Sequence, residues 1–126
     1  MSRMQRDKGA KAERYIVNRL KEAGFDRVAR NLEQTRSGGF DILGLEPLAI
    51  EVKDQKQLRV AEWWRQAVQQ AREGQIPVLA YHRPGTSIWR VILPLSAFCS
   101  GWEDSGITVE LDFDDAVVIF REIVGG

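Results

Sequence analysis

The feature that most constrains the fold is a succession of three apolar patterns between residues 48 and 82. "LAIEVKD" at 48–54 alternates apolar and polar residues as a β-strand does, whereas residues 60–73 place apolar side chains at helical spacing. "IPVLAYH" at 76–82 is an almost continuous apolar run, which is typical of a strand covered on both faces. The intervening helix is long enough for a right-handed crossover between parallel strands. We therefore expect a mixed central β-sheet flanked by helices, in the α/β or α+β class.

Two helices are predicted from apolar residues that recur every three or four positions. The first covers residues 8–23 and stops at Gly24, and the second covers about 60–73 and is capped by Gly74. The stripes expected to face the core are Ala12, Ile16, Val17, Leu20 and Ala23 in the first helix, and Val60, Trp64, Ala67, Val68 and Ala71 in the second.

Four further segments have strand-like patterns, namely "DRVARNL" at 26–32, "FDILGL" at 40–45, "SIWRVILPL" at 87–95 and "ITVELDF" at 107–113. The dipeptide "EP" predicts a hairpin between the second of these and the strand at 48–54. The turn "RPGT" joins the third to the apolar run before it. "DDAVVIFREIV" fits a terminal helix, although the strand and helix patterns after residue 99 are less clear than the others.

Length and composition indicate one soluble domain. A chain of 126 residues with 44% hydrophobic and 29% charged residues can bury a core without crosslinks. Cys99 is the only cysteine, so we expect a reducing, intracellular and cytoplasmic setting. The polar N-terminus lacks the apolar stretch of a secretory signal, and no apolar run is long enough for a membrane span.

Charge is unevenly distributed although the net charge is zero. Residues 1–36 hold ten Lys and Arg against five Asp and Glu, whereas residues 101–126 hold one Arg against seven acids. Such a division predicts either a basic face that meets a polyanion or, more simply, solvated blocks of charge. We expect a domain core at about 8–95 and an acidic C-terminal extension at about 99–126.

The candidate chemistry centres on "AIEVKD" at 49–54. Glu51 and Lys53 are two positions apart in a strand and therefore point to the same face. The predicted hairpin brings Asp41 beside Glu51. Two converging carboxylates in a half-buried place repel each other and lose hydration, so a positive group is expected between them. Either Lys53 or a divalent cation such as Mg²⁺ or Mn²⁺ would serve.

Two side chains on the predicted helices point to the same place. Glu13 falls on or beside the core-facing stripe of the first helix, where a carboxylate requires a polar pocket. Gln66 is in a similar position on the second helix, on the side shared with Trp63, Arg59 and Gln70.

In this order, "KGAKAERYIVNRLKEAGF", "TRSGGFDILGL" and "IEVK" resemble the PD-(D/E)xK nuclease superfamily, most of all the Holliday-junction resolvases of archaea and phages. The resemblance covers residues 8 to about 95, with "GFD" in place of the first motif. It implies a restriction-endonuclease-like core and an Mg²⁺-dependent endodeoxyribonuclease that cuts branched DNA and acts in recombination or repair, with a phage origin as one option that the resemblance leaves open. Paired cuts in a four-way junction further imply a C2 homodimer.

The resemblance also implies roles for individual residues. Asp41 and Glu51, with the carbonyl of Val52, would bind the metal, which Mn²⁺ could replace. Lys53 would orient or deprotonate the attacking water or stabilise the transition state. Glu13 would hold a metal-bound water or a second ion, and Gln66 would order the site. The expected DNA-binding residues are Lys8, Lys11, Arg14, Thr35, Arg36, Ser37 and Gly38.

Three alternatives stay open. These are a restriction-like or repair nuclease that cuts duplex DNA, a nucleic-acid-binding module of the same fold without catalysis, and a protein-interaction domain whose acidic tail binds a basic partner. His82 and Cys99 are expected to be structural or surface residues. The four tryptophans are expected to anchor the core or an interface, and adjacent Trp63 and Trp64 cannot both face the core because neighbours on a helix are about 100° apart.

Overall fold

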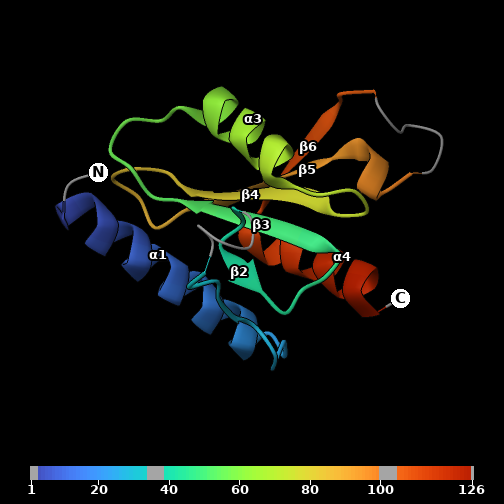
Figure 1. The fold of residues 1–126 in the computed structure, drawn as a ribbon, viewed down its shortest axis with the longest axis horizontal. Coiled ribbons are helices and arrows are strands. Elements are labelled where there is room, and N and C mark those ends of the chain that lie inside the picture. Colours follow the sequence, from blue (N-terminus) through green and yellow to red (C-terminus); the bar gives the residue numbers. More distant parts are fainter. Residues whose placement is uncertain (1–2, 34–38, 100–104, 126) are drawn as a thin grey trace.

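The computed structural model describes residues 3–33, 39–99 and 105–125. Its centre is a mixed six-stranded sheet with the strand order β1-β2-β3-β4-β5-β6, and the protein is of the α+β class. Helices α1 and α4 cover one face of the sheet and α3 covers the other (Figure 1). The elements are α1 (Arg3–Glu22), β1 (Ala29–Arg30), β2 (Ile42–Leu43), β3 (Leu48–Lys53), α3 (Val60–Gln70), β4 (Ile76–His82), β5 (Trp89–Pro94), η1 (Leu95–Ala97), β6 (Thr108–Asp112) and α4 (Phe113–Gly125).

The crossover predicted between residues 48 and 82 is confirmed. Strands β3 and β4 are parallel, with Glu51 opposite Leu79, and α3 connects them across one face. The remaining strand pairs are antiparallel, including the β2–β3 hairpin with Ile42 opposite Ile50. Apolar residues of both faces of β3 and β4 are buried, because helices cover the sheet on both sides.

The buried stripe of α3 differs from the predicted one. Trp63 is buried and packs with Leu79, Tyr81 and Ile92, while Trp64 is half-buried beside this cluster. Val68, expected in the core, is 47% exposed. Compared with the predicted stripe, α3 is rotated so that the Trp63 indole packs on β4 and β5 in place of Val68. The ring centroids of Trp63 and Tyr81 are 6.2 Å apart.

Several helix and strand boundaries also differ from the predicted ones. Helix α1 begins at Arg3 instead of residue 8, α3 ends at Gln70 instead of residue 73, and β1 and β2 have only two residues each. Gly44 explains why β2 is so short. Its φ is +95°, which is outside the strand region, so β2 ends before it. A Cβ at this position would lie 2.3 Å from the carbonyl oxygen of Arg27, so only glycine fits there.

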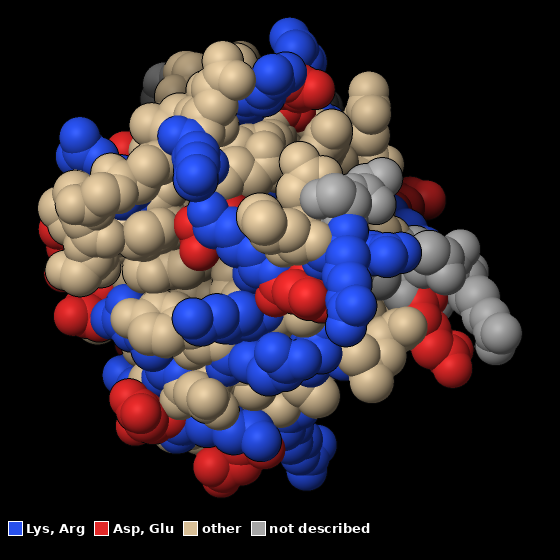
Figure 2. Space-filling view, turned by 90° about the vertical axis from the view of Figure 1, so that its left-hand side faces the viewer, with Lys and Arg blue, Asp and Glu red and all other residues tan. Residues whose placement is uncertain are grey.

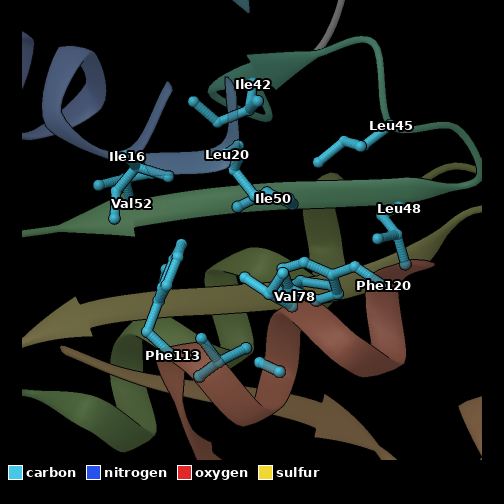
Figure 3. Close-up of a cluster of buried hydrophobic side chains, with 14 of the residues drawn as sticks. Ile16, Leu20, Ile42, Leu45, Leu48, Ile50, Val52, Val78, Phe113 and Phe120 are labelled. Atoms are coloured by element: carbon cyan, nitrogen blue, oxygen red, sulfur yellow. The ribbon is translucent and has the colours of Figure 1, made fainter. Parts of the chain in front are cut away.

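The acidic C-terminal segment is part of the same body over residues 108–125. Strand β6 pairs with β5, and α4 buries Phe113 and Phe120 in the main core. The guanidinium of Arg19 lies 4.3 Å from the ring centroid of Phe113, and Arg121 donates a 2.6 Å hydrogen bond to the carbonyl of Ala23. Figure 3 shows the cluster, with Ile16 and Leu20 of α1, Ile50 and Val52 of β3, Val78 of β4, and both phenylalanines. Within the described residues, no helix is long and apolar enough to cross a bilayer.

Candidate active site

Backbone pairing places Asp41 beside the C-terminal half of β3. Its amide donates to the carbonyl of Ile50 at 2.7 Å, and its own carbonyl accepts a 2.8 Å hydrogen bond from the amide of Asn31. Its side chain then continues the ladder, because Asp41 Oδ2 accepts a 2.8 Å hydrogen bond from the amide of Val52. Asp41 is therefore held by main-chain contacts on three sides and is only 3% exposed.

Asp41 and Glu51 form a buried carboxylate pair, as the hairpin predicted. Glu51 is 6% exposed, and the two carboxyl groups share a hydrogen bond. Burial, the largest cause, raises the pKa of Glu51 to about 9, and repulsion from Asp41 adds to the effect. Burial also raises the pKa of Asp41 to about 7, against the hydrogen bond from Val52. At neutral pH the pair retains at least one proton, which Glu51 donates to Asp41.

Lys53, the last residue of β3, places a positive charge near the pair. Lys53 is half-buried, and its ammonium lowers the pKa of both carboxyl groups without cancelling the effect of burial. Because the amide and the carbonyl of a strand residue point to the same side, the carbonyl of Val52 faces the edge where Asp41 lies. Two carboxylates, a backbone oxygen and an ammonium therefore meet at this end of the sheet.

Glu13 lies near the pair but is occupied by another partner. Its side chain is buried in α1, and its negative charge raises the pKa of both Asp41 and Glu51. Arg30 of β1 donates from Nε to Glu13 Oε1 at 3.0 Å. Among the residues that the structure describes, no group of three or more His, Cys, Asp or Glu side chains is arranged to hold a metal ion. Glu13 is thus engaged with Arg30 in this structure, and its expected role in holding a metal-bound water or a second ion stays a prediction.

The α3 residue that reaches the pair is Gln70, one turn after the predicted Gln66. With its amide nitrogen facing inward, Gln70 donates to Glu51 Oε2 and to the carbonyl of Gly39 at 3.0 Å. Gly39 leaves room for this contact, since a Cβ there would lie 2.4 Å from the Gln70 side chain. Gln66 is half-buried on the same side of α3.

Sequence reasoning also missed Arg30 and Asn31. Asn31 is 2% exposed, and its side chain donates to the carbonyl of Phe40 and accepts from the amide of Glu33. These contacts tie the chain after β1 to the chain before Asp41. The available signal was an Asn directly before the last residue of the strand-like segment at 26–32, because buried amides are found where they are hydrogen-bonded.

The predicted DNA-binding residues are only partly described. Thr35, Arg36, Ser37 and Gly38 lie outside the described residues, whereas Lys11 and Arg14 are exposed on α1. Lys8 Nζ lies 3.6 Å from Asp54 Oδ1.

Lys and Arg side chains spread over the end of the molecule shown in Figure 2, with a few carboxylates between them. This end carries the start of α1, the segment between β3 and α3, and the β4–β5 turn (Figure 1). The basic residues of these segments are Arg3, Arg6, Lys8, Lys11, Arg14, Lys53, Lys56, Arg59 and Arg83.

Comparison with known proteins adds no relative. No protein-family model matches the chain. No curated protein matches it. No solved structure matches it either. The resemblance to the PD-(D/E)xK nucleases, including the restriction-endonuclease-like core, therefore stays a prediction from the motifs.

Proposed function

We propose that the protein is an Mg²⁺-dependent endonuclease that hydrolyses phosphodiester bonds in DNA, with Asp41, Glu51 and Lys53 as its catalytic residues. The observation that carries the proposal is the buried contact between the Asp41 and Glu51 carboxyl groups. Two buried carboxyl groups whose charges repel each other lower the stability of the fold, and a bound cation reverses that cost. The arrangement is therefore expected where a cation is used.

The donor set suits Mg²⁺ in particular. Mg²⁺ usually binds proteins through one or two carboxylates, keeps several waters and takes phosphate oxygens from the substrate. Asp41, Glu51 and the carbonyl of Val52 offer hard oxygen ligands of this kind. Glu13 would add negative charge nearby while Arg30 holds its carboxylate in place.

The residues of the chain would then divide the work of hydrolysis. A bound Mg²⁺ supplies Lewis-acid stabilisation of the scissile phosphate and lowers the pKa of water. Lys53 places an ammonium within electrostatic reach of both carboxylates, where it would orient the water or stabilise charge on the phosphate. Gln70 holds the orientation of Glu51 by donating to its Oε2.

DNA is the proposed substrate because β3, which carries Glu51, ends at the end of the molecule where basic side chains gather. Lys53 is the last residue of β3, and the start of α1 and the β3–α3 segment, which lie at the same end, also carry basic residues. Figure 2 shows Lys and Arg side chains spread over this end. Such a surface attracts phosphates without regard to sequence. Four-way junctions are the branched substrate that the motifs imply, and a homodimer would supply the two active sites needed for paired cuts.

A DNA-binding module without catalysis is the second candidate. It is favoured by the ion pair that occupies Glu13, which leaves two carboxylates beside Lys53. In this alternative the Asp41–Glu51 pair would stay protonated, and the basic end would bind DNA with strong salt dependence but no metal requirement.

A cleavage assay separates these candidates. A labelled four-way junction and a linear duplex of the same sequence are incubated with Mg²⁺ or EDTA and the wild type, Glu51→Gln or Glu73→Gln. Glu73 is an exposed glutamate beyond α3 and serves as the matched control. We expect metal-dependent cuts by the wild type and Glu73→Gln, and none by Glu51→Gln.

The pattern of products refines the result. Paired symmetric cuts confined to the junction support a resolvase, whereas cuts in the linear duplex support the restriction-like or repair nuclease. Binding of both DNAs without cleavage under Mg²⁺ or Mn²⁺ would contradict the proposal and favour the module without catalysis.

A further inference from the structure

A pocket of about 530 Å³ lies between α1 and the sheet, and the proposed catalysis makes no use of it. One wall is the α1 face that carries Lys8, Lys11 and Tyr15. The other wall is formed by Asp54, His82 and Trp89 from the ends of β3, β4 and β5. Its volume falls in the range of sites that hold small organic molecules.

Aromatic rings line the pocket. The ring centroids of Tyr15 and Trp89 are 5.7 Å apart with their planes inclined by 24°, and the His82 ring lies 5.3 Å from Trp89. Trp89 is buried and fixed in the core, whereas Tyr15 is 43% exposed at the pocket mouth. Because Trp89 is buried against the rings of Tyr15 and His82, the accessible aromatic surface is the exposed part of Tyr15, which Trp89 supports from behind and which suits a planar ring.

Charged groups of both signs surround these rings. Asp54 Oδ1 accepts a 3.0 Å hydrogen bond from His82 Nδ1 and lies 3.6 Å from Lys8 Nζ, so its position is fixed. Lys11 and Asp7 are exposed at the rim. Lysines suit a phosphate, and carboxylates accept hydrogen bonds from the amino and imino groups of nucleobases.

We infer that this pocket binds one unstacked nucleotide of the DNA substrate, with its base against the aromatic wall and its phosphate near Lys8 and Lys11. The inference rests on the proposed function in taking DNA as the ligand. The pocket lies at the same end of β3 as Lys53, because Asp54 directly follows Lys53 in the chain. It is on the α1 face of the sheet, however, whereas Gln70 reaches Glu51 from α3 on the other face. An unpaired or splayed nucleotide enters such a pocket more easily than a stacked one.

The test measures binding without cleavage, in EDTA. Fluorescence anisotropy follows three labelled DNAs: a paired duplex, the same duplex with a one-nucleotide bulge, and a single strand. The proteins are the wild type, Tyr15→Ala and the control Phe98→Ala, which removes an aromatic ring of similar exposure outside the pocket. We expect the wild type to prefer the bulged and single-stranded DNAs, and Tyr15→Ala to bind them about tenfold more weakly with little change for the paired duplex.

A second pair of variants tests the phosphate contact. Lys11→Ala is compared with Lys21→Ala, which removes an exposed lysine from the last turn of α1 and away from the pocket. The measured quantity is the slope of log binding constant against log salt concentration for the bulged DNA. Lys11→Ala should reduce this slope by about 1, the value for one phosphate contact, and Lys21→Ala should reduce it less. Thermal melting of each variant shows whether it is folded, and Tyr15→Phe, which keeps the ring, should bind like the wild type.

Free nucleotides distinguish the two sources of the ligand. Deoxynucleoside monophosphates are titrated while the indole N–H signal of Trp89 is followed by NMR. Weak binding that disappears in Tyr15→Ala supports the inference when the bulged DNA binds more tightly. Mononucleotide binding combined with no preference for unpaired DNA would overturn the assignment of this pocket to the DNA substrate.

Failure of the pocket and failure of the nuclease are distinguishable. If Tyr15→Ala binds all three DNAs like the wild type while the wild type cleaves and Glu51→Gln does not, the pocket inference is wrong and the nuclease proposal stands. If the wild type prefers unpaired DNA through Tyr15 but cleaves nothing with any divalent metal, the pocket inference stands and the nuclease proposal is wrong.

Discussion

Two sets of charged side chains lie across neighbouring strands of the sheet, and they differ in burial and in sign. On β5 and β6, Arg90 donates from Nε to Glu110 at 2.9 Å and also contacts Asp112, with the three side chains 25%, 39% and 63% exposed. Asp41, directly before β2, and Glu51 of β3 are both acids and are almost fully buried.

The contrast shows which cluster needs an outside partner. The Arg90 network neutralises itself in water, and such exposed ion pairs contribute little to stability. The negative charge of the buried pair is not neutralised in the same way. Lys53 lowers the pKa of both acids, but burial raises it by more. We interpret the first cluster as structural and the second as a site whose full set of interactions includes a cation.

The largest expected effect is on cleavage. Asp41→Asn should lower the rate by about a thousandfold or more, because it removes a charge that would hold the cation. Asp112→Asn, which removes a carboxylate from the exposed network, should leave the rate within about twofold. Initial rates on the preferred DNA in Mg²⁺ test this pair, and equal losses in both variants would remove the proposed distinction between the clusters.

The second effect concerns stability and pH in the absence of metal. The folded-state pKa of Asp41 is about 7 and that of Glu51 is about 9, both above the unfolded values near 4. Their protonated forms therefore stabilise the folded protein fully below about pH 4, and this stabilisation is lost as the pH rises through 7 and 9. Wild-type protein in EDTA should lose on the order of a few kcal/mol of unfolding free energy between pH 5 and 9.

Glu51→Gln should be less sensitive to pH, because the Gln amide can donate to Asp41 as the protonated acid does. It should consequently be more stable than the wild type at pH 9 in EDTA, although we expect it to be inactive in cleavage. Urea unfolding at pH 5, 7 and 9 measures the difference. A wild type that is stabilised on raising the pH would show that the carboxylates are not protonated in the fold.

A smaller effect is expected at Gln70. Gln70→Leu removes the donor to Glu51 Oε2 and should lower the cleavage rate by about tenfold. Gln66→Leu, one turn earlier on α3, is the matched comparison and should have the weaker effect. Single-turnover rates with saturating enzyme distinguish the two, and the reverse order would restore the role first expected for Gln66.

The smallest effect is expected in the exposed network. Arg90→Ala should lower the free energy of unfolding by about 1 kcal/mol or less. High salt should shrink the difference from the wild type, because exposed charges are screened. Denaturant melts at low and high NaCl measure this. A loss of several kcal/mol would mean that this network, too, is buried or coupled to the core.

The order of helices and strands was largely predictable, because periodicity and hairpins depend on residues close together in the sequence. The crossover from β3 to β4 follows from an alternating run, a helical run and an apolar run in that order. The approach of Asp41 to Glu51 follows from the hairpin, since Ile42 pairs with Ile50 and each acid is one residue from that pair. The hairpin therefore brings two acids that are ten residues apart in the sequence into contact.

The structure departs from the expected arrangement where two neighbouring helical turns or two neighbouring residues fit a pattern equally well. Gln66 and Gln70 are four residues apart and share a face of α3, so spacing alone does not decide which one reaches Glu51. Trp63 and Trp64 each extend an apolar stripe of α3. Packing against β4 and β5 determines that Trp63 is the one that is buried. The Glu13–Arg30 ion pair depends on how β1 lies against α1, which no local pattern encodes.

Calorimetric titration of the metal-free wild type with Mg²⁺ or Mn²⁺ at pH 7, in buffers of different ionisation enthalpy, tests the central claim most directly. Because the carboxylate pair holds at least one proton at this pH, binding of one ion should release about one proton or more, and Glu51→Gln should neither bind the ion comparably nor release that proton. Saturable binding with this proton release would establish the pair as a cation site. No binding, or binding that Glu51→Gln leaves unchanged, would contradict it.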